Sequence, residues 1–67
     1  MSANANEDGV YEEWILTWFA PDGDKQYRTP DEDKARKKAT REGVAEWNPL
    51  LEHRITRVTV ETMLVTL

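Results

Sequence analysis

The side chains best suited to chemistry in this sequence are four bases spaced for one face of a helix. They follow one another at i, i+3, i+4 and i+7, a spacing that aligns side chains on an α-helix, and they are Lys34, Lys37, Lys38 and Arg41. Clustered ammonium and guanidinium groups bind the phosphates of nucleic acid or an acidic protein. A solvated helix surface, with acids opening the helix and bases following, explains the same pattern. We favour the solvated surface and keep nucleic-acid binding as the alternative function.

A second candidate site is the uncharged run at residues 62–67. Left exposed, a segment with strand propensity and neither charge nor proline would aggregate. We therefore expect it to form a fourth strand of the sheet or to contact another subunit or a partner. The second face of the strand predicted at 11–20 is apolar too, and one helix cannot cover both faces of a sheet. The predicted contact residues on these two segments are Ile15, Phe19, Met63, Val65 and Leu67.

No group of residues predicts catalysis, a metal or a cofactor. His53, the one histidine, lies between Glu52 and Arg54, which is typical of a surface or strand-edge residue. The segment Asp22-Gly23-Asp24 lacks the full calcium-loop pattern, and there is no phosphate-binding glycine-rich loop. Ser2 is the one serine and stands in a polar N-terminal stretch, and no carboxylate pair has the apolar setting that raises a pKa. We predict a non-enzymatic protein without a small-molecule substrate, because so small a fold has little room for a pocket.

Length and composition predict one small domain of marginal stability, which a partner subunit would stabilise. Folding of 67 residues hides only about 60% of the surface of the unfolded chain, so stability is marginal. The chain has no cysteine, so a partner subunit, with a homodimer as the expected form, takes the place of a disulfide. The net charge of −4 weighs against non-specific binding of nucleic acid. Residues 1–10 predict a disordered tail, and no segment resembles a signal peptide or a membrane span, so we expect a cytoplasmic protein.

The densest apolar run, at residues 11–20, predicts the central strand of a sheet. Trp14, Leu16 and Trp18 alternate with the side chains of the other face, as they do in a β-strand. Pro21-Asp22-Gly23 then predicts a type I turn with a glycine bulge. Residues 25–28 follow as a short second strand, which is polar and suits an edge of the sheet.

The next segment predicts one helix packed on the sheet. Thr29 followed by Pro30 is a good helix start, with Thr29 as the N-cap and Glu32 as the carboxylate of a capping box. The helix should end between residues 41 and 46. Small residues recur every four positions and should let the helix lie close to the tryptophans of the sheet; they are Ala35, Ala39 and Gly43.

The rest of the chain predicts a third strand at residues 54–60, after a connector at 47–53. The alternation slips near Glu61 and Thr62, which indicates a bulge, a turn or a C-terminal piece that extends away from the domain. A right-handed crossover through the helix brings the third strand beside the first. The predicted fold class is α+β: an antiparallel sheet of order 2-1-3, a possible fourth strand, and one helix on one face.

The segment from Trp18 to Thr29, followed by an Ala-rich basic helix and a Val/Thr strand, resembles known small proteins. It is similar to ββαβ orphan proteins of actinobacteria and their phages, and this likeness implies a phage or mobile-element accessory protein without assigning functional residues. It also resembles the arm-DNA-binding domains of tyrosine integrases, from which it differs in having two strands rather than three before the helix and in being acidic. We therefore predict a protein-interaction module that self-associates or binds a host protein.

Overall fold

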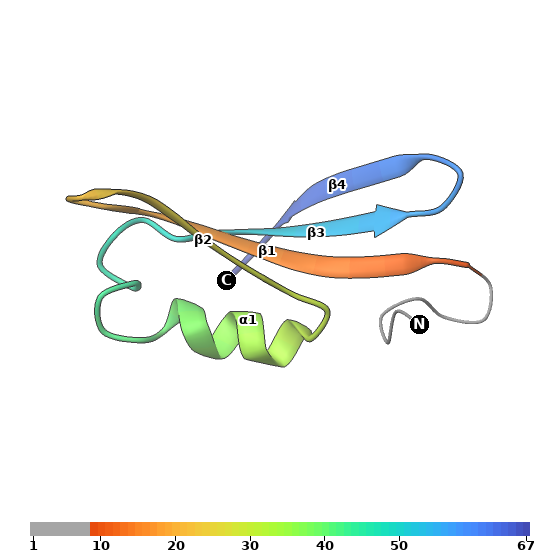
Figure 1. Cartoon of the computed structure of the whole chain (residues 1–67). Coiled ribbons are helices and arrows are strands. Elements are labelled where there is room, and N and C mark those ends of the chain that lie inside the picture. Colours follow the sequence, from red (N-terminus) through yellow and green to blue (C-terminus); the bar gives the residue numbers. More distant parts are fainter. Residues whose placement is uncertain (1–8) are drawn as a thin grey trace.

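The computed structural model describes residues 9–67, which form a four-stranded antiparallel sheet and one helix (Figure 1). The sheet order β2-β1-β3-β4 confirms the predicted α+β fold and shows that the C-terminal run is a fourth strand, paired with β3. The predicted tail lies outside the described residues except for Gly9 and Val10. The elements are β1 (Tyr11–Ala20), β2 (Gly23–Thr29), α1 (Glu32–Ala39), β3 (Leu50–Thr56) and β4 (Val60–Val65).

The β1–β2 hairpin forms where the turn residues predict it. Ala20 pairs with Gly23, so the connection is the two residues Pro21 and Asp22. Gly23 has φ 132°, a backbone conformation that side chains with a Cβ rarely adopt. Lys25 donates to the Asp22 carboxylate at 3.2 Å, and this hydrogen bond and the charge of Lys25 lower the pKa of Asp22. Local chemistry therefore accounts for the tight reversal.

The core lies between α1 and the centre of the sheet. Leu16 of β1 and Leu51 of β3 are opposite each other in register, and both are fully buried. Ala35 and Ala39 bring the helix against them, which confirms the predicted role of these small residues. The remaining buried member is Val44, and the partly buried side chains packed around the cluster are Trp14, Trp18, Tyr27 and Val65. The tryptophans therefore flank the core rather than form its centre.

The helix begins later than the sequence predicts. Asp31 is the N-cap, because its carboxylate accepts from the backbone N–H of Asp33 at 3.0 Å and of Lys34 at 3.4 Å. Thr29, the predicted cap, is instead the last residue of β2, and its hydroxyl accepts from the Asp31 N–H. The predicted capping box is also wrong, because Glu32 pairs with Arg36 at 2.8 Å.

The helix also ends earlier than predicted, at Ala39. Thr40 caps it, and the chain then passes through turns in which Gly43 has φ 86°. Gly43 therefore does not belong to the helical stripe, and Val44 fills the next buried position. These turns carry the chain to Trp47, whose carbonyl accepts from the Phe19 N–H at the end of β1.

The last two strands differ most from the prediction. Residues 50–53, predicted as a connector, begin β3, and the chain reverses at 57–59, where the Arg57 N–H donates to the Thr59 carbonyl. The slip in alternation is therefore a hairpin, placed a few residues before the predicted turn at Glu61 and Thr62. The C-terminal piece folds back on its own sheet instead of extending away.

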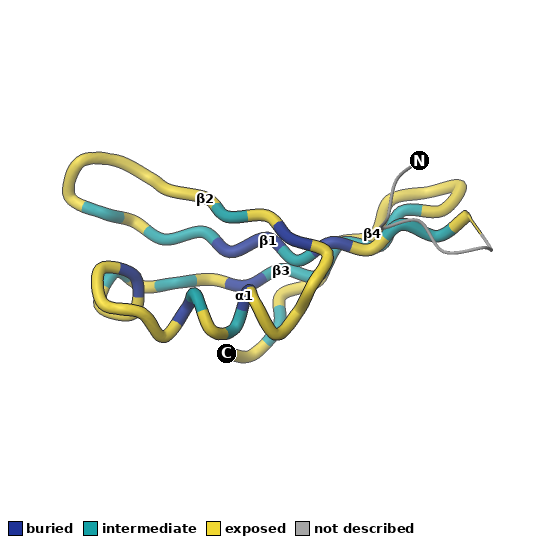
Figure 2. Tube along the Cα trace, turned by 60° about the horizontal axis from the view of Figure 1, so that its bottom comes forward, coloured by how far each residue is buried: buried dark blue, intermediate teal, exposed yellow. Residues whose placement is uncertain are grey.

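The single helix covers one part of one face of the sheet. The turn between β3 and β4 projects beyond it and is exposed (Figure 2). The opposite face of the sheet has no helix on it among the described residues (Figure 1). We refer to this face as the outer face.

Because Ala35 is fully buried against the sheet, Ala35→Leu should destabilise the fold by about 1–3 kcal/mol through overpacking. Lys37→Leu places the same side chain on the exposed side of α1 and should change stability by less than about 0.5 kcal/mol. Urea unfolding followed by circular dichroism measures both. Equal midpoints for the wild type and Ala35→Leu would contradict the packing described above.

Candidate functional site

The apolar residues of the outer face are less available for contact than the sequence suggests. Ile15 lies on this face, as predicted, but it is 1% exposed, and its cross-strand neighbours are Arg28 and Glu52. Ile15 therefore offers almost no surface to a partner. Phe19 and Leu50 remain exposed near the other end of the face.

A belt of polar contacts crosses the outer face through a buried carboxylate. Glu13 of β1 lies 3.5 Å from the guanidinium of Arg28 on β2 and 3.9 Å from that of Arg54 on β3. The Tyr11 hydroxyl donates to the same carboxylate, and Arg54 continues the belt by donating to Thr62 of β4. Every strand of the sheet contributes one or more of these groups.

The role of Glu13 was not predicted from the sequence. The signal was present, because Glu13 alternates in phase with Ile15 and therefore had to lie on the same face. Its two arginine partners stand 15 and 41 residues away in the sequence (28 − 13 and 54 − 13), so only strand pairing could identify them.

The strand β4 forms an edge of the sheet, and it is the more apolar edge. Met63 is 51% exposed and Leu64 72% exposed, on opposite faces of the strand, and Glu61 is its one charged residue. The C-terminal end of β4 is fixed to the helix, because Arg36 donates to the Thr66 carbonyl at 2.8 Å. The side of β4 away from β3 has no strand beside it among the described residues.

The five predicted contact residues do not share one surface. Ile15 and Phe19 lie on the outer face, whereas Met63 and Val65 lie on the helix face, opposite His53 and Leu51 in the register of β3. Val65 packs against the core. Leu67 lies past the end of β4 and is exposed.

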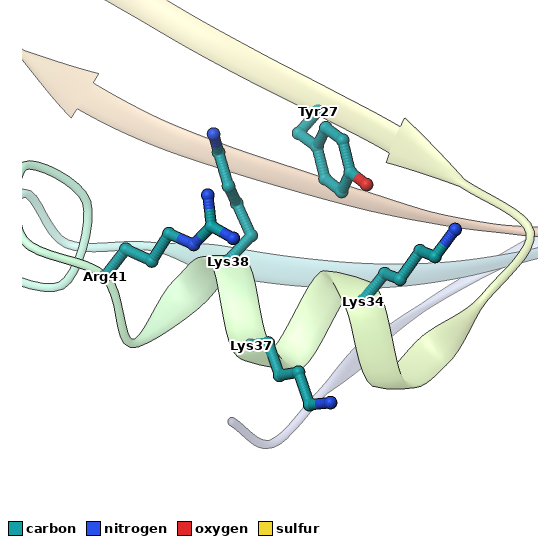
Figure 3. Close-up of a pocket in the computed structure, with 5 residues that line it drawn as sticks. All are labelled: Tyr27, Lys34, Lys37, Lys38 and Arg41. Carbon is teal, nitrogen blue, oxygen red and sulfur yellow. The ribbon is translucent and has the colours of Figure 1, made fainter.

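The four predicted bases line a pocket of about 340 Å³ beside α1, together with Tyr27 of β2 (Figure 3). Lys34 and Lys38 extend towards β2 and Tyr27, whereas Lys37 points away (Figure 3). The Lys38 ammonium lies 5.6 Å from the centre of the Tyr27 ring and 5.9 Å from that of Trp18, within the range of cation–π attraction. The helix therefore divides the predicted basic face into two sides.

Ion pairing divides the bases in the same way. On the far side of α1, Lys37 pairs with Asp33 at 3.1 Å. Within residues 9–67, no carboxylate forms an ion pair with Lys34, Lys38 or Arg41. The pocket therefore keeps three cations without an acidic partner from the described part of the chain.

His53 takes part in a cross-strand stack. Its ring lies parallel to that of Trp14, with the centroids 3.9 Å apart, and its Nε2 atom is 2.9 Å from a carboxylate oxygen of Glu12. Across residues 9–67 no cluster of three or more His, Cys, Asp or Glu side chains is placed to hold a metal. The contacts of His53 are those of a structural residue on the sheet.

The one helix of the described chain is too short and too polar to span a membrane. No protein-family model, curated protein or solved structure matches this chain. The resemblance to small phage-associated proteins therefore stays a prediction.

Because Glu13 pairs with Arg28 and Arg54 on the two neighbouring strands, we predict that it is needed for stability. Glu13→Gln leaves Arg28 and Arg54 facing each other without a carboxylate, which should destabilise the fold by about 1–3 kcal/mol. Glu42→Gln removes the same charge from an exposed turn and should change stability by less than about 0.5 kcal/mol. Thermal and urea unfolding at neutral pH compare the two variants. A Glu13→Gln variant as stable as Glu42→Gln would show that the belt adds nothing to the fold.

Proposed function

We propose that the protein is a non-enzymatic interaction module that self-associates through the free edge of β4. The observation that carries this proposal is the exposed, nearly uncharged strand at that edge. An edge strand presents unpaired backbone N–H and C=O groups and is a template for pairing with another strand. The side chains of Met63 and Leu64 add apolar surface on both faces of the same edge.

The two edges of the sheet differ in a way that supports β4 as the contact. The opposite edge, β2, carries Asp24, Lys25 and Arg28, and charges of this kind discourage stray strand pairing. The outer face is also a weaker candidate, because the Glu13 belt crosses it and Ile15 is buried within it. Of the two surfaces that the sequence predicts, the uncovered sheet face and the C-terminal strand, we therefore favour the edge of the C-terminal strand.

A second copy of the chain is the simplest occupant of this edge. Antiparallel pairing of two β4 strands is isologous, so each copy offers the same surface to the other and the assembly closes as a dimer. Pairing would join the sheets of the two copies across the β4 edges. A contact built on six-residue strands is small, so we expect weak association, with a Kd of roughly 1–100 μM.

Sedimentation velocity over a concentration series should show a reversible monomer–dimer equilibrium. Leu64→Lys places a charge at the exposed edge without disturbing a buried group, and it should weaken association by about tenfold or more. Gln26→Lys makes the same change in charge at the β2 edge and should leave association unchanged. A wild-type chain that stays monomeric at about 500 μM would overturn the proposal, as would equal weakening by both variants.

A further inference from the structure

We propose that the pocket between α1 and β2 binds a small phosphorylated ligand of the size of a mononucleotide. This inference goes beyond the proposed function and does not depend on it, because the pocket lies at the β2 side of the sheet and the dimer contact at β4. It also revises the expectation that the fold has little room for a small molecule. The residues that carry it are Lys34, Lys38, Arg41 and Tyr27.

The charge arrangement points to an anion. Lys34 and Lys38 are one helical turn apart, and like charges at that spacing repel each other. The acids that would relieve this repulsion, Glu32 and Asp33, pair instead with Arg36 and Lys37. A phosphate held among the three free cations would replace the missing carboxylates with charge-assisted hydrogen bonds.

The three cations offer different donor groups to a phosphate. Arg41 offers the planar, forked donor group that binds two oxygens of a phosphate at once. Lys34 and Lys38 are compact charges on flexible stems, and Figure 3 shows both reaching from the helix towards Tyr27. The half-buried ring of Tyr27 adds an apolar surface against which a base or a sugar could pack.

Size and net charge favour a small ligand over an extended nucleic acid. A pocket of about 340 Å³ falls at the lower end of the range typical of small-molecule sites. The helix that carries the bases begins with Asp31, Glu32 and Asp33, and the whole chain has a net charge of −4. A long polyanion that leaves the pocket past the start of the helix would approach the Asp31 carboxylate, which forms no ion pair within residues 9–67. A ligand with one to three phosphates is short enough to stay among the bases.

The test is a titration of the full ¹⁵N-labelled chain with AMP and with pyrophosphate, followed by NMR. Both ligands should shift the amide signals around Tyr27, Lys34, Lys38 and Arg41 with saturation. A variant carrying both Lys34→Gln and Lys38→Gln should bind about tenfold more weakly or worse. The control, Arg57→Gln, removes a positive charge from the exposed turn between β3 and β4, which does not line the pocket; it should bind within about twofold of the wild type.

Three results would overturn the proposal. One is the absence of saturable shifts up to about 10 mM ligand, an affinity too weak for a binding site. Another is an equal loss on Arg57→Gln, which would indicate a general charge effect. The last is a single-stranded oligonucleotide that binds more than about tenfold tighter than AMP with a steep salt dependence, because that outcome would make the site an extended nucleic-acid surface. Circular dichroism of each variant verifies that the exposed substitutions leave the fold intact.

Discussion

One short helix packs against a sheet that is much longer than the helix. This difference in length decides where the core lies and which surfaces of the sheet stay uncovered. The eight residues of α1 span about 12 Å, whereas the ten residues of β1 extend over about 33 Å. The helix reaches the sheet closely because Ala35 and Ala39 face Leu16 and Leu51. This contact makes a small core at the middle of the sheet, and larger aromatic side chains close its margins. The outer face and the β4 edge stay uncovered by any helix of the described chain.

The outer face and the β4 edge differ in how much apolar surface they leave exposed. On the outer face, Glu13 and its two arginines use charge and hydrogen bonds where a second helix would supply apolar contact. Ile15, whose cross-strand neighbours are polar, is 1% exposed, so the middle of the face offers little apolar surface, and only Phe19 and Leu50 stay exposed near its other end among the apolar residues of β1 and β3. At the β4 edge Glu61 is the one charged residue, and Met63 and Leu64 remain exposed beside a backbone edge that pairs with no further strand within residues 9–67. The asymmetry between face and edge explains why the edge is the better place for a contact between copies.

A second asymmetry lies within the helix. Its acids and bases are spaced so that Glu32 pairs with Arg36 and Asp33 with Lys37, which neutralises one side of α1. The other side faces β2 and collects the bases that have no carboxylate partner within residues 9–67. An acidic protein can therefore carry a local cationic pocket, because short-range pairing decides which charges remain free. Tyr27 belongs to both the margin of the core and the wall of this pocket.

The sequence by itself determined the features that depend on residues close together in the chain. The alternation at residues 11–20, the Pro-Asp-Gly turn and the small residues of the helix predicted β1, the first hairpin and the face of α1 that packs. Tertiary structure decided the rest: that Asp31 rather than Thr29 caps the helix, that β3 begins at Leu50, and which bases share a pocket. The helix begins after Thr29, because Thr29 pairs with Trp14 of β1 and β2 therefore extends to that residue. The position of the last hairpin depends on the pairing of β3 with β1. Such contacts join residues far apart in the chain, so local patterns carry no record of them.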